Sequence, residues 1–381
     1  MRLLTYQYQD KAPSRWKLPR INLDDNINLI GGLSAVGKTR LLNTIFNLSL
    51  IIQKKRDISA GCWELEFQVE QSIYKYILHL EIDRSTHNVV VAKEQLTKND
   101  TNIISRNKQT FLLRGKKLPA LSKEDTGIYL LKEDKKIEQI YNEFKKIYIR
   151  RLNPTYFGVP EDFTQLGGIT KEVLEKEPGQ FTPEYIQSNF RDVNTQLLLL
   201  KMHHRRIYES IFRDFKTIFP FVADMNVKPA KEVKQLTIQM KLPLDIVIPV
   251  LVIKEKGVKE EIPIMNMSSG MLRCIIQLVD IYSMPDDSIY LIDELENSMG
   301  VRALPQMTDI LLSRSNKLQL IFTSHLPYVF NNVNIRHWRI LTRKGSQVTV
   351  TSGASLDKKY SQSHQDAYTQ LINSELIEDG I

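Results

Sequence analysis

The eight residues 32–39 carry the clearest chemical pattern in this 381-residue sequence. They read Gly-Leu-Ser-Ala-Val-Gly-Lys-Thr, which matches the phosphate-binding pattern G-x4-G-K-[ST]. The apolar run 27–30 precedes them and an amphipathic stretch follows from Arg40, so we expect a strand, a turn and the start of a helix. Glycine lets successive backbone N–H groups converge on phosphate oxygens, and the N-terminus of the helix adds partial positive charge there.

The side chains of this loop have separate expected tasks. Lys38 is predicted to reach the β- and γ-phosphates of a nucleoside triphosphate, and the hydroxyl of Thr39 is predicted to bind Mg²⁺. The full set predicted to contact the nucleotide is Gly32, Ser34, Ala35, Val36, Gly37, Lys38, Thr39 and Arg40.

A pair of acids follows a second apolar strand. Residues 288–292 lean apolar and are followed directly by Asp293 and Glu294. Ligand sites of α/β proteins lie at the carboxyl ends of buried parallel strands, where these two acids are placed. Asp293 is expected to hold Mg²⁺ through water, and Glu294 to polarise an attacking water as a general base. Because many strands end in acids, the pair has meaning only together with the rest of the site.

Two further segments complete the candidate site. The apolar run 318–322 ends in Thr-Ser-His, and His325 is expected to contact the γ-phosphate and sense its loss; alone, it would more simply be a packing residue. The residues Ser268, Ser269 and Gly270 lie in the segment that opens a predicted helix over 274–282, whose apolar residues share one face.

The rest of the chain supplies the elements that must position these groups. Alternating apolar and polar residues over 62–95 predict antiparallel strands, and the polar stretch 97–109 predicts a loop or hairpin tip. Residues 130–144 are predicted to be helical. The stretch 187–219 has helical periodicity and predicts either an inserted helical subdomain or a covering helix of the same domain. Trp16 either packs in the core or stacks on a nucleotide base.

We therefore expect an α/β fold with a mixed sheet, an antiparallel β lobe and an inserted helical subdomain. The expected boundaries are 1–152 for the lobe with the phosphate loop, 153–233 for the helical insertion, 234–350 for the lobe with the remaining motifs, and 351–381 for a C-terminal tail.

Composition excludes several classes. The longest apolar runs, such as 197–200 and 246–253, are far shorter than the ~20 residues that a membrane span needs. Two cysteines, Cys62 and Cys274, support neither a disulfide framework nor a metal site. We expect a cytoplasmic protein without a membrane partner. The net charge of +8 is compatible with DNA contact or with a merely basic surface.

Taken together, these motifs resemble the nucleotide-binding domain of the ABC-type ATPases, and within them the SMC-like and OLD-like group. The run 291–299, Leu-Ile-Asp-Glu-Leu-Glu-Asn-Ser-Met, is similar to the "IDE-x-EN-S-L" segment of that group, and 268–273 is similar to its degenerate signature motif. The resemblance covers roughly 1–60 and 262–345.

The resemblance implies ATP and Mg²⁺ as cofactors and a homodimer or higher homo-oligomer. Ser268 and Gly270 of one subunit would close over the ATP that Lys38 of the other subunit holds. It also implies that this closure controls a separate effector protein, a nuclease or a toxin, in bacterial anti-phage defence. Only 56 residues follow His325, so we expect no nuclease domain of the kind that full OLD proteins carry.

Some features depart from the family pattern, and other functions stay open. Gly300 stands where a histidine followed by proline is frequent, and an arginine near 151 occupies the expected place of a metal-sensing glutamine. One alternative is a DNA-repair or recombination ATPase similar to RecF, which clamps DNA. Another is a scaffold that nucleotide locks, with little turnover. A small-molecule kinase would leave the Ser-Ser-Gly and Ser-His segments without a task.

Overall fold

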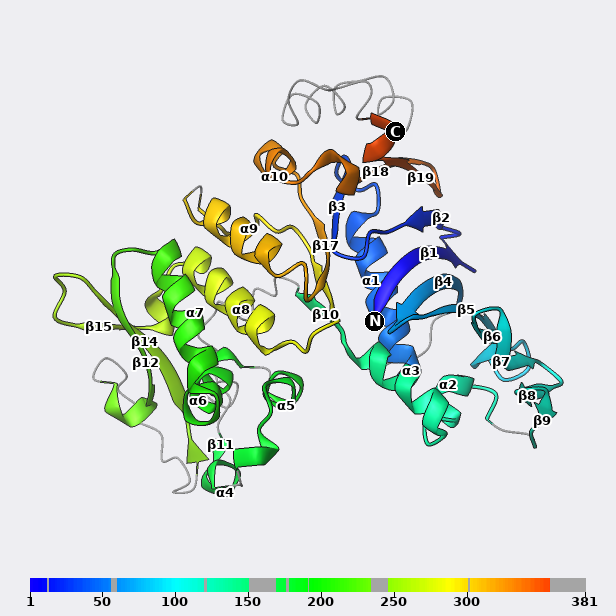
Figure 1. The fold of residues 1–381 in the computed structure, drawn as a ribbon, viewed down its shortest axis with the longest axis horizontal. Coiled ribbons are helices and arrows are strands. Elements are labelled where there is room, and N and C mark those ends of the chain that lie inside the picture. The colour runs from blue at the N-terminus through cyan, green and yellow to red at the C-terminus, as the bar shows by residue number, and fades with distance from the viewer. Residues whose placement is uncertain are drawn as a thin grey trace. The chain divides into compact units, whose positions relative to one another are not determined.

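A computed structural model describes the chain in nine stretches, which are residues 1–11, 14–55, 60–119, 122–150, 169–175, 178–190, 192–233, 246–300 and 302–356. The chain divides into two compact units (Figure 1). The first unit comprises 1–151, 286–295 and 315–381, and the second comprises 152–285 and 296–314. The phosphate loop, Asp293, Glu294 and His325 therefore share the first unit, while Ser268 to Gly270 belong to the second.

A large mixed sheet forms the first unit. Within the described residues it has 14 strands in the order β10-β16-β17-β3-β18-β19-β2-β1-β4-β5-β6-β7-β8-β9. Five strands at one end form an all-parallel block: β10 (Ile147–Arg150), β16 (Ile289–Ile292), β17 (Gln319–Thr323), β3 (Ile27–Gly31) and β18 (Trp338–Lys344). The expected mixed α/β fold is confirmed.

The parallel block positions the candidate site. Every residue of β16 and β17 is buried, as expected for parallel strands whose two faces are both covered. In the register of the sheet, Ile292 pairs with Phe322 and Thr323 pairs with Ile30. The segments that follow β3, β16 and β17 therefore leave the sheet at the same edge, which brings the loop, the acids and His325 together.

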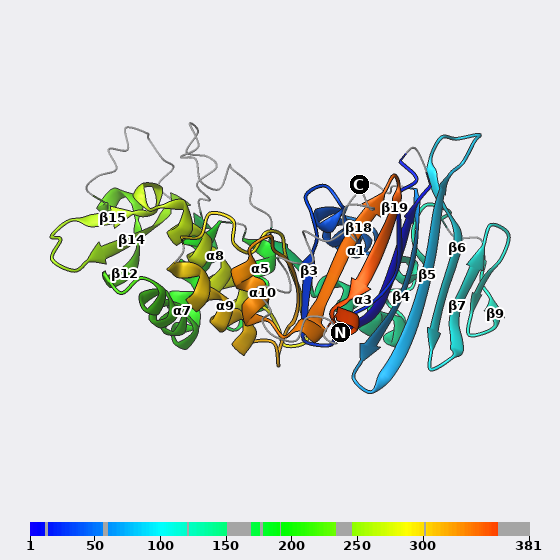
Figure 2. The same ribbon diagram turned by 90° about the horizontal axis from the view of Figure 1, so that it is seen from above.

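The rest of this sheet is largely antiparallel and matches the predicted β lobe. Strands β1, β4 and β5 lie side by side with β6 and β7 beyond them (Figure 2). Their bounds are β1 Arg2–Asp10, β2 Lys17–Asn22, β4 Gly61–Val69, β5 Ser72–Ile82, β6 Val89–Lys98, β7 Thr101–Asn107, β8 Phe111–Leu113, β9 Lys116–Lys117 and β19 Gln347–Ser352. Buried and partly exposed residues alternate along the whole of β4, which confirms the predicted two-residue period.

Of the two alternatives for 97–109, the loop is wrong and the hairpin is confirmed, although residues 101–107 form a strand of that hairpin and not only its tip. Strand β6 continues to Lys98, the chain turns at Asn99 and Asp100 with φ of 42° and 64°, and β7 then returns along β6. Polar residues dominate this stretch because one face of the hairpin is exposed, whereas Ile104 lies in the core. Because the exposed face is mostly polar, composition alone did not indicate strand β7.

Short helices complete the first unit. Helix α1 (Lys38–Ile52) packs its apolar side into a continuous core with Trp63, Phe67 and Phe144. Helix α3 (Lys135–Lys145) begins later than the predicted position 130, because Asp134 accepts hydrogen bonds from the backbone N–H groups of Lys136 and Ile137 and caps the helix there. The other helices are α2 Gly127–Leu130, α10 Pro327–Asn332 and α11 Gly353–Leu356, with a 3-10 turn at Ile335–His337.

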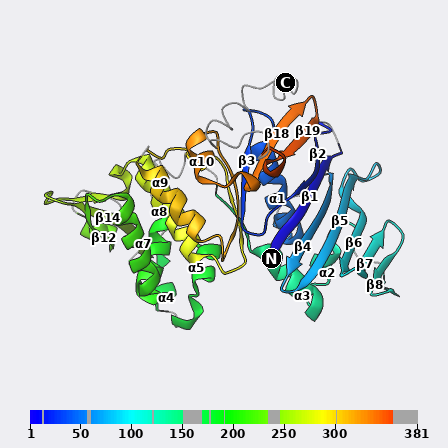
Figure 3. The ribbon, with the colours of Figure 1, turned by 45° about the horizontal axis from the view of Figure 1, so that its top comes forward.

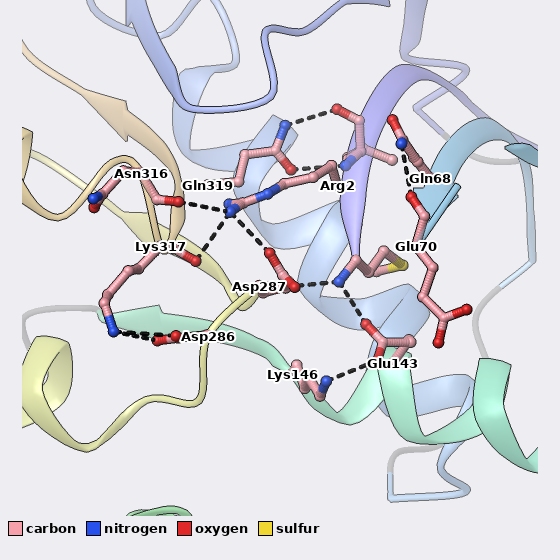
Figure 4. A network of polar contacts seen from close by, with 12 residues as sticks. Arg2, Gln68, Glu70, Glu143, Lys146, Asp286, Asp287, Asn316, Lys317 and Gln319 are labelled. Atoms are coloured by element: carbon pink, nitrogen blue, oxygen red, sulfur yellow. Dashed lines mark hydrogen bonds and ion pairs between the residues drawn. The ribbon is translucent and has the colours of Figure 1, made fainter. Parts of the chain in front are cut away.

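A polar network joins the N-terminal ends of several strands (Figure 4). The α-amino group of Met1 donates to Glu143 at 2.5 Å and to the backbone oxygen of Asp287 at 2.8 Å. Arg2 donates to the Asp287 carboxylate and to the backbone oxygen of Lys317, both at 3.0 Å. These contacts link β1 to the segments that enter β16 and β17. They hold the parallel block at the edge opposite to the phosphate loop.

The second unit combines helices with small sheets. Helices α7 (Arg205–Ile218), α8 (Ser269–Ser283) and α9 (Ala303–Ser313) pack side by side (Figure 3). Strands β12 (Val222–Pro229), β14 (Pro249–Glu255) and β15 (Glu261–Pro263) form one sheet, and β11 (Ile169–Thr170) pairs with β13 (Ile246–Val247). The remaining helices are α4 Lys171–Leu174, α5 Pro183–Asn189 and α6 Val193–His203, with 3-10 turns at Pro178–Gln180, Ala230–Glu232 and Ile264–Asn266.

The periodic stretch 187–219 is three helices rather than one. Asp192 accepts hydrogen bonds from the N–H groups of Asn194 and Thr195 and so starts α6, while His204 separates α6 from α7. Apolar spacing continues across both breaks, so periodicity alone did not reveal them.

Two regions of interest lie outside the described residues: the expected glutamine position near 151 and the tail after 356. In the described part of the chain, no helix has both the length and the apolar character needed to cross a membrane.

Candidate nucleotide-binding site

The loop between β3 and α1 needs glycine at two positions. Gly32 has φ of 130° and Gly37 has φ of 110°, in the region that residues with a Cβ seldom adopt. A Cβ on Gly32 would lie 2.2 Å from the backbone oxygen of Leu341, and one on Gly37 would lie 2.8 Å from the ring of Trp16. The loop is therefore pressed between β18 on one side and Trp16 on the other.

The ammonium group of Lys38 lies inside this loop. The residue is 5% exposed, and Nζ donates to the backbone oxygens of Gly32 at 2.8 Å and Leu33 at 2.7 Å. These bonds hold the charge under the arch of the loop, where phosphate oxygens bind in proteins with this motif.

Thr39 and Asp293 meet at the end of the parallel block. The Thr39 hydroxyl donates to Oδ1 of Asp293 at 3.1 Å, and the hydroxyl of Thr323 donates to the same oxygen at 3.0 Å. The described residues contain no cluster of three or more His, Cys, Asp or Glu side chains that would form a complete metal cage. Mg²⁺ normally takes one or two protein ligands and completes its shell with water and phosphate oxygens. The hydroxyl and carboxylate of Thr39 and Asp293 fit that ion.

Glu294 has an unusual backbone conformation. Its φ is 47°, in the left-handed region. Its N–H donates to the hydroxyl of Thr323 at 2.7 Å, and the N–H of Leu295 donates to the backbone oxygen of Thr323 at 3.0 Å. The turn that carries the predicted general base is thus hydrogen-bonded to the end of β17.

These groups border one pocket of about 380 Å³ in the first unit. Its lining residues are Ser34, Ala35, Gly37, Lys38, Thr39, Arg40, Asn43, Asp293, Glu294, Thr323, His325 and Arg343. The structure therefore brings together the phosphate loop, the two acids and the histidine that the sequence pointed to. Val36 is buried, and Gly32 takes part through its backbone oxygen.

A family model matches residues 126–331, more than half of the chain. Its description reads "AAA domain, putative AbiEii toxin, Type IV TA system", and the family is named AAA_21. The chain belongs to the AAA_21 family. This confirms the expected membership among AAA-type ATPases.

The AAA_21 match contains Ser268 to Gly270, Asp293, Glu294 and His325, but it begins after the phosphate loop. The fold joins the two parts, because β3 lies between β17 and β18 in the sheet. The nucleotide-binding loop of this AAA_21 protein is thus placed against the matched region by strand pairing.

Several solved structures overlap with the AAA_21 chain. An SMC head bound to the C-terminal winged-helix domain of ScpA has a TM-score of 0.46 at 11% identity, over 92% of this chain and 97% of that one. The SMC head domain from Thermotoga maritima has a TM-score of 0.41 at 13% identity, over 92% and 99%. The Smc head domain with an extended coiled coil, bound to the C-terminal domain of ScpA derived from Pyrococcus furiosus, has a TM-score of 0.44 at 13% identity, over 94% and 98%. No curated protein matches the sequence.

The Ser-Ser-Gly segment lies in the second unit, where Ser268 caps helix α8. Its hydroxyl accepts a hydrogen bond from the N–H of Met271 at 3.3 Å. A Cβ on Gly270 would lie 2.8 Å from the backbone oxygen of Ser298. The glycine therefore lets the start of α8 approach the segment that follows the acids.

Arg40 lines the pocket and contacts three other residues. Its guanidinium lies 4.9 Å from the centre of the Trp16 ring, forms an ion pair with Asp10 and donates to the Ser14 hydroxyl at 2.7 Å. Trp16 is 1% exposed, so it is a core residue covered by Arg40 rather than an open platform for a base.

Sequence reasoning missed three lining residues of the pocket. Thr323 precedes the Ser-His pair, but the pattern gave it no task. Asn43 lies one helical turn after Thr39, and its Oδ1 has no hydrogen-bond partner among the described residues. The i, i+4 spacing was a signal that could have found Asn43. Arg343 comes from β18, which no motif marks; only the strand order brings it to the loop.

Proposed function

We propose that this AAA_21 protein binds ATP and hydrolyses it to ADP and phosphate. The observation that carries the proposal is the contact of Thr39 with Asp293 beside the turn that bears Glu294, at the mouth of the phosphate loop. A loop that served only to reverse the chain would not need to lie beside two acids and a histidine that follow two other strands.

The residues suggest a simple division of tasks. Lys38 and the loop N–H groups bind the phosphates and stabilise the charge that develops on them. Glu294 orients a water molecule and accepts its proton as the water oxygen bonds to the γ-phosphorus and the bond from that phosphorus to the ADP oxygen breaks. His325 contacts the γ-phosphate from the neighbouring strand end. Thr39 and Asp293 would hold Mg²⁺, which supplies neutralisation of phosphate charge when bound.

We infer further that ATP drives closure of a homodimer or larger homo-oligomer, with Ser268 and Gly270 of one subunit facing the nucleotide of another. This closure would control a separate effector, a nuclease or toxin, in the cytoplasm of a bacterium under phage attack. The words "toxin" and "TA system" in the description of the AAA_21 family support that setting.

Two alternatives make different predictions. A DNA clamp similar to RecF predicts that DNA stimulates hydrolysis and that DNA affinity falls steeply with salt; the net charge of +8 is the observation in its favour. A nucleotide-locked scaffold predicts that assembly with ATP occurs without appreciable turnover.

The decisive experiment compares the mass in solution of the wild type and Glu294→Gln, with and without ATP and Mg²⁺. The glutamine variant should bind ATP, lose at least ~100-fold in turnover because it lacks a general base, and accumulate as a dimer or larger species. Ordinary turnover by Glu294→Gln would refute the general-base role.

Ser268→Arg tests the shared site. The variant should bind ATP like the wild type, because Lys38 is untouched, yet fail to assemble with ATP, because a long cation replaces a small cap. Unchanged assembly and turnover would refute the two-subunit model. Ser283→Ala, at the other end of the same helix, tests whether any change of a serine in α8 has this effect.

A further inference from the structure

We propose that Thr323 is the positioning residue that sets both acids of the site at once. Its side chain and backbone make three hydrogen bonds to three consecutive residues of the neighbouring turn. The hydroxyl donates to Oδ1 of Asp293 at 3.0 Å and accepts from the N–H of Glu294 at 2.7 Å, and the backbone oxygen accepts from the N–H of Leu295 at 3.0 Å.

The position of Thr323 is set by the sheet. Strands β16 and β17 pair in parallel, with Ile292 beside Phe322, so the last residue of β17 comes beside the first residue after β16. Thr323 is 0% exposed. Because bulk water does not reach the Thr323 hydroxyl, protein groups must supply its hydrogen-bond partners.

The first task of Thr323 is to hold Glu294 in its conformation. With φ of 47°, Glu294 occupies a region that residues other than glycine seldom adopt and that surrounding contacts must maintain. The Thr323 hydroxyl takes the N–H of this residue and thereby fixes the direction in which its side chain leaves the turn. A relaxed turn would point the carboxylate elsewhere.

The second task is to orient Asp293. Its Oδ1 receives hydrogen bonds from the hydroxyls of Thr323 and Thr39, which lie on two different elements, β17 and α1. A hydroxyl has one proton to donate and lone pairs to accept with, so Thr323 is able to serve Asp293 and Glu294 at the same time. Serine has the same capacity, whereas valine has the same shape and neither function.

This inference rests on the proposed hydrolysis of ATP, and it assigns Thr323 a role through Asp293 and Glu294. Loss of the hydroxyl should therefore lower kcat at least tenfold and raise the Mg²⁺ concentration for half-maximal rate severalfold. The affinity for ATP should change less than threefold, because Lys38 and the loop are untouched.

The experiment compares the full chain as wild type, Thr323→Val, Thr323→Ser and Thr308→Val. Thr308 is the matched control, because it is a buried threonine whose hydroxyl donates only to the Leu304 backbone oxygen within its own helix. For each protein, the steady-state rate, the dissociation constant of a fluorescent ATP analogue, the Mg²⁺ dependence and the melting temperature are measured.

We expect Thr323→Val to have a lower kcat, a higher Mg²⁺ concentration for half-maximal rate and a near-normal affinity for ATP. Thr323→Ser and Thr308→Val should both stay within threefold of the wild-type rate. Wild-type rate and Mg²⁺ dependence in Thr323→Val would overturn the proposal. If the valine variant does not fold, a folded Thr323→Ser decides: retained rate supports the role of the hydroxyl, and a rate lost tenfold refutes it.

The design separates this inference from the proposed function. A wild-type protein that binds ATP but never hydrolyses it would refute the ATPase proposal. The role of Thr323 would then be measured by the Mg²⁺ dependence of ATP binding, which Thr323→Val should weaken and Thr323→Ser should preserve; equal dependence in both would refute it.

Discussion

The hydroxyl of Thr39 lies 3.1 Å from Oδ1 of Asp293, although 254 positions separate the two residues in the chain. Thr39 begins helix α1 after strand β3, and Asp293 follows β16. Strand β17 runs between those two strands, and its last residue, Thr323, donates to the same oxygen. The start of α1, the turn after β16 and the end of β17 therefore meet at one carboxylate. Because that carboxylate lies beside the phosphate-binding loop, the loop becomes part of a candidate site for hydrolysis.

Replacing Lys38 with Ala should abolish measurable binding of both ATP and inorganic tripolyphosphate. The substitution removes the charge under the loop and the bonds that tie it to Gly32 and Leu33. Calorimetric titration with both ligands would measure the loss. Lys54→Ala is the control, because Lys54 is an exposed lysine that pairs with Asp125 on the surface and should leave both affinities unchanged. Retained binding by Lys38→Ala would mean that the loop does not hold phosphates.

Replacing Arg343 with Ala should lower the affinity for ATP and for tripolyphosphate alike, by about 3- to 10-fold, or roughly 1 kcal/mol. Arg343 lines the pocket, and its guanidinium forms no ion pair with the described residues, so it is available to phosphate oxygens. Arg343→Lys should recover part of the affinity. The melting temperature should not move, which separates this role from a structural one.

The control for Arg343 is Arg20→Ala, which removes an arginine whose ion pair with Glu66 is on the surface of the same unit. If Arg343→Ala binds ATP more weakly but tripolyphosphate as before, the guanidinium contacts the nucleoside instead. If the affinity for neither ligand falls, Arg343 is no part of the site.

Replacing Gly270 with Ala should destabilise the protein by about 1–3 kcal/mol, the usual effect of forcing extra atoms into a packed contact. The new Cβ would meet the backbone oxygen of Ser298 at 2.8 Å, so α8 or that segment must shift, although alanine favours helix. Urea denaturation would measure the change. Gly300→Ala is a close control, since its Cβ meets nothing within 4 Å. Equal stability of the two variants would contradict the packing argument.

Acid should weaken the ion pairs of Asp24 with His337 and Arg339. Burial raises the pKa of Asp24, but the hydrogen bond from His337 and the charge of Arg339 outweigh it, and the net pKa lies below the usual 3.8. A carboxyl whose folded pKa is lowered stabilises the fold above its unfolded pKa and loses that contribution as the pH falls through the folded value.

Asp24→Asn should therefore reduce the free energy of unfolding most at neutral pH and progressively less below about pH 4. Chemical denaturation between pH 7 and pH 3 would measure the difference from wild type. Asp286→Asn is a suitable comparison, because Asp286 pairs with Lys317 on the exposed surface and should contribute little at any pH. A constant deficit of Asp24→Asn across this range would refute the ionic explanation.

Much of the fold was predictable because its signals are local. Gly32 and Gly37 mark positions where the backbone has a positive φ that glycine adopts easily. The apolar runs of β16 and β17 are continuous, and buried and partly exposed residues alternate along β4. Local reasoning failed where a surface was polar or a break was short. The strand β7 was taken for a loop or the tip of a hairpin, and the helices α5, α6 and α7 were taken for a single periodic stretch.

The sequence by itself determined which residues are suited to bind phosphate, to hold Mg²⁺ and to activate water, since these depend on residue type and spacing over a few positions. Only the tertiary structure decided that Thr323 serves both acids, that Arg343 reaches the loop and that Gly270 meets Ser298. Each of these contacts joins segments brought together by strand order, register or helix packing. A pattern along one chain does not contain that order, because the free energy that selects it comes from burying distant segments against one another.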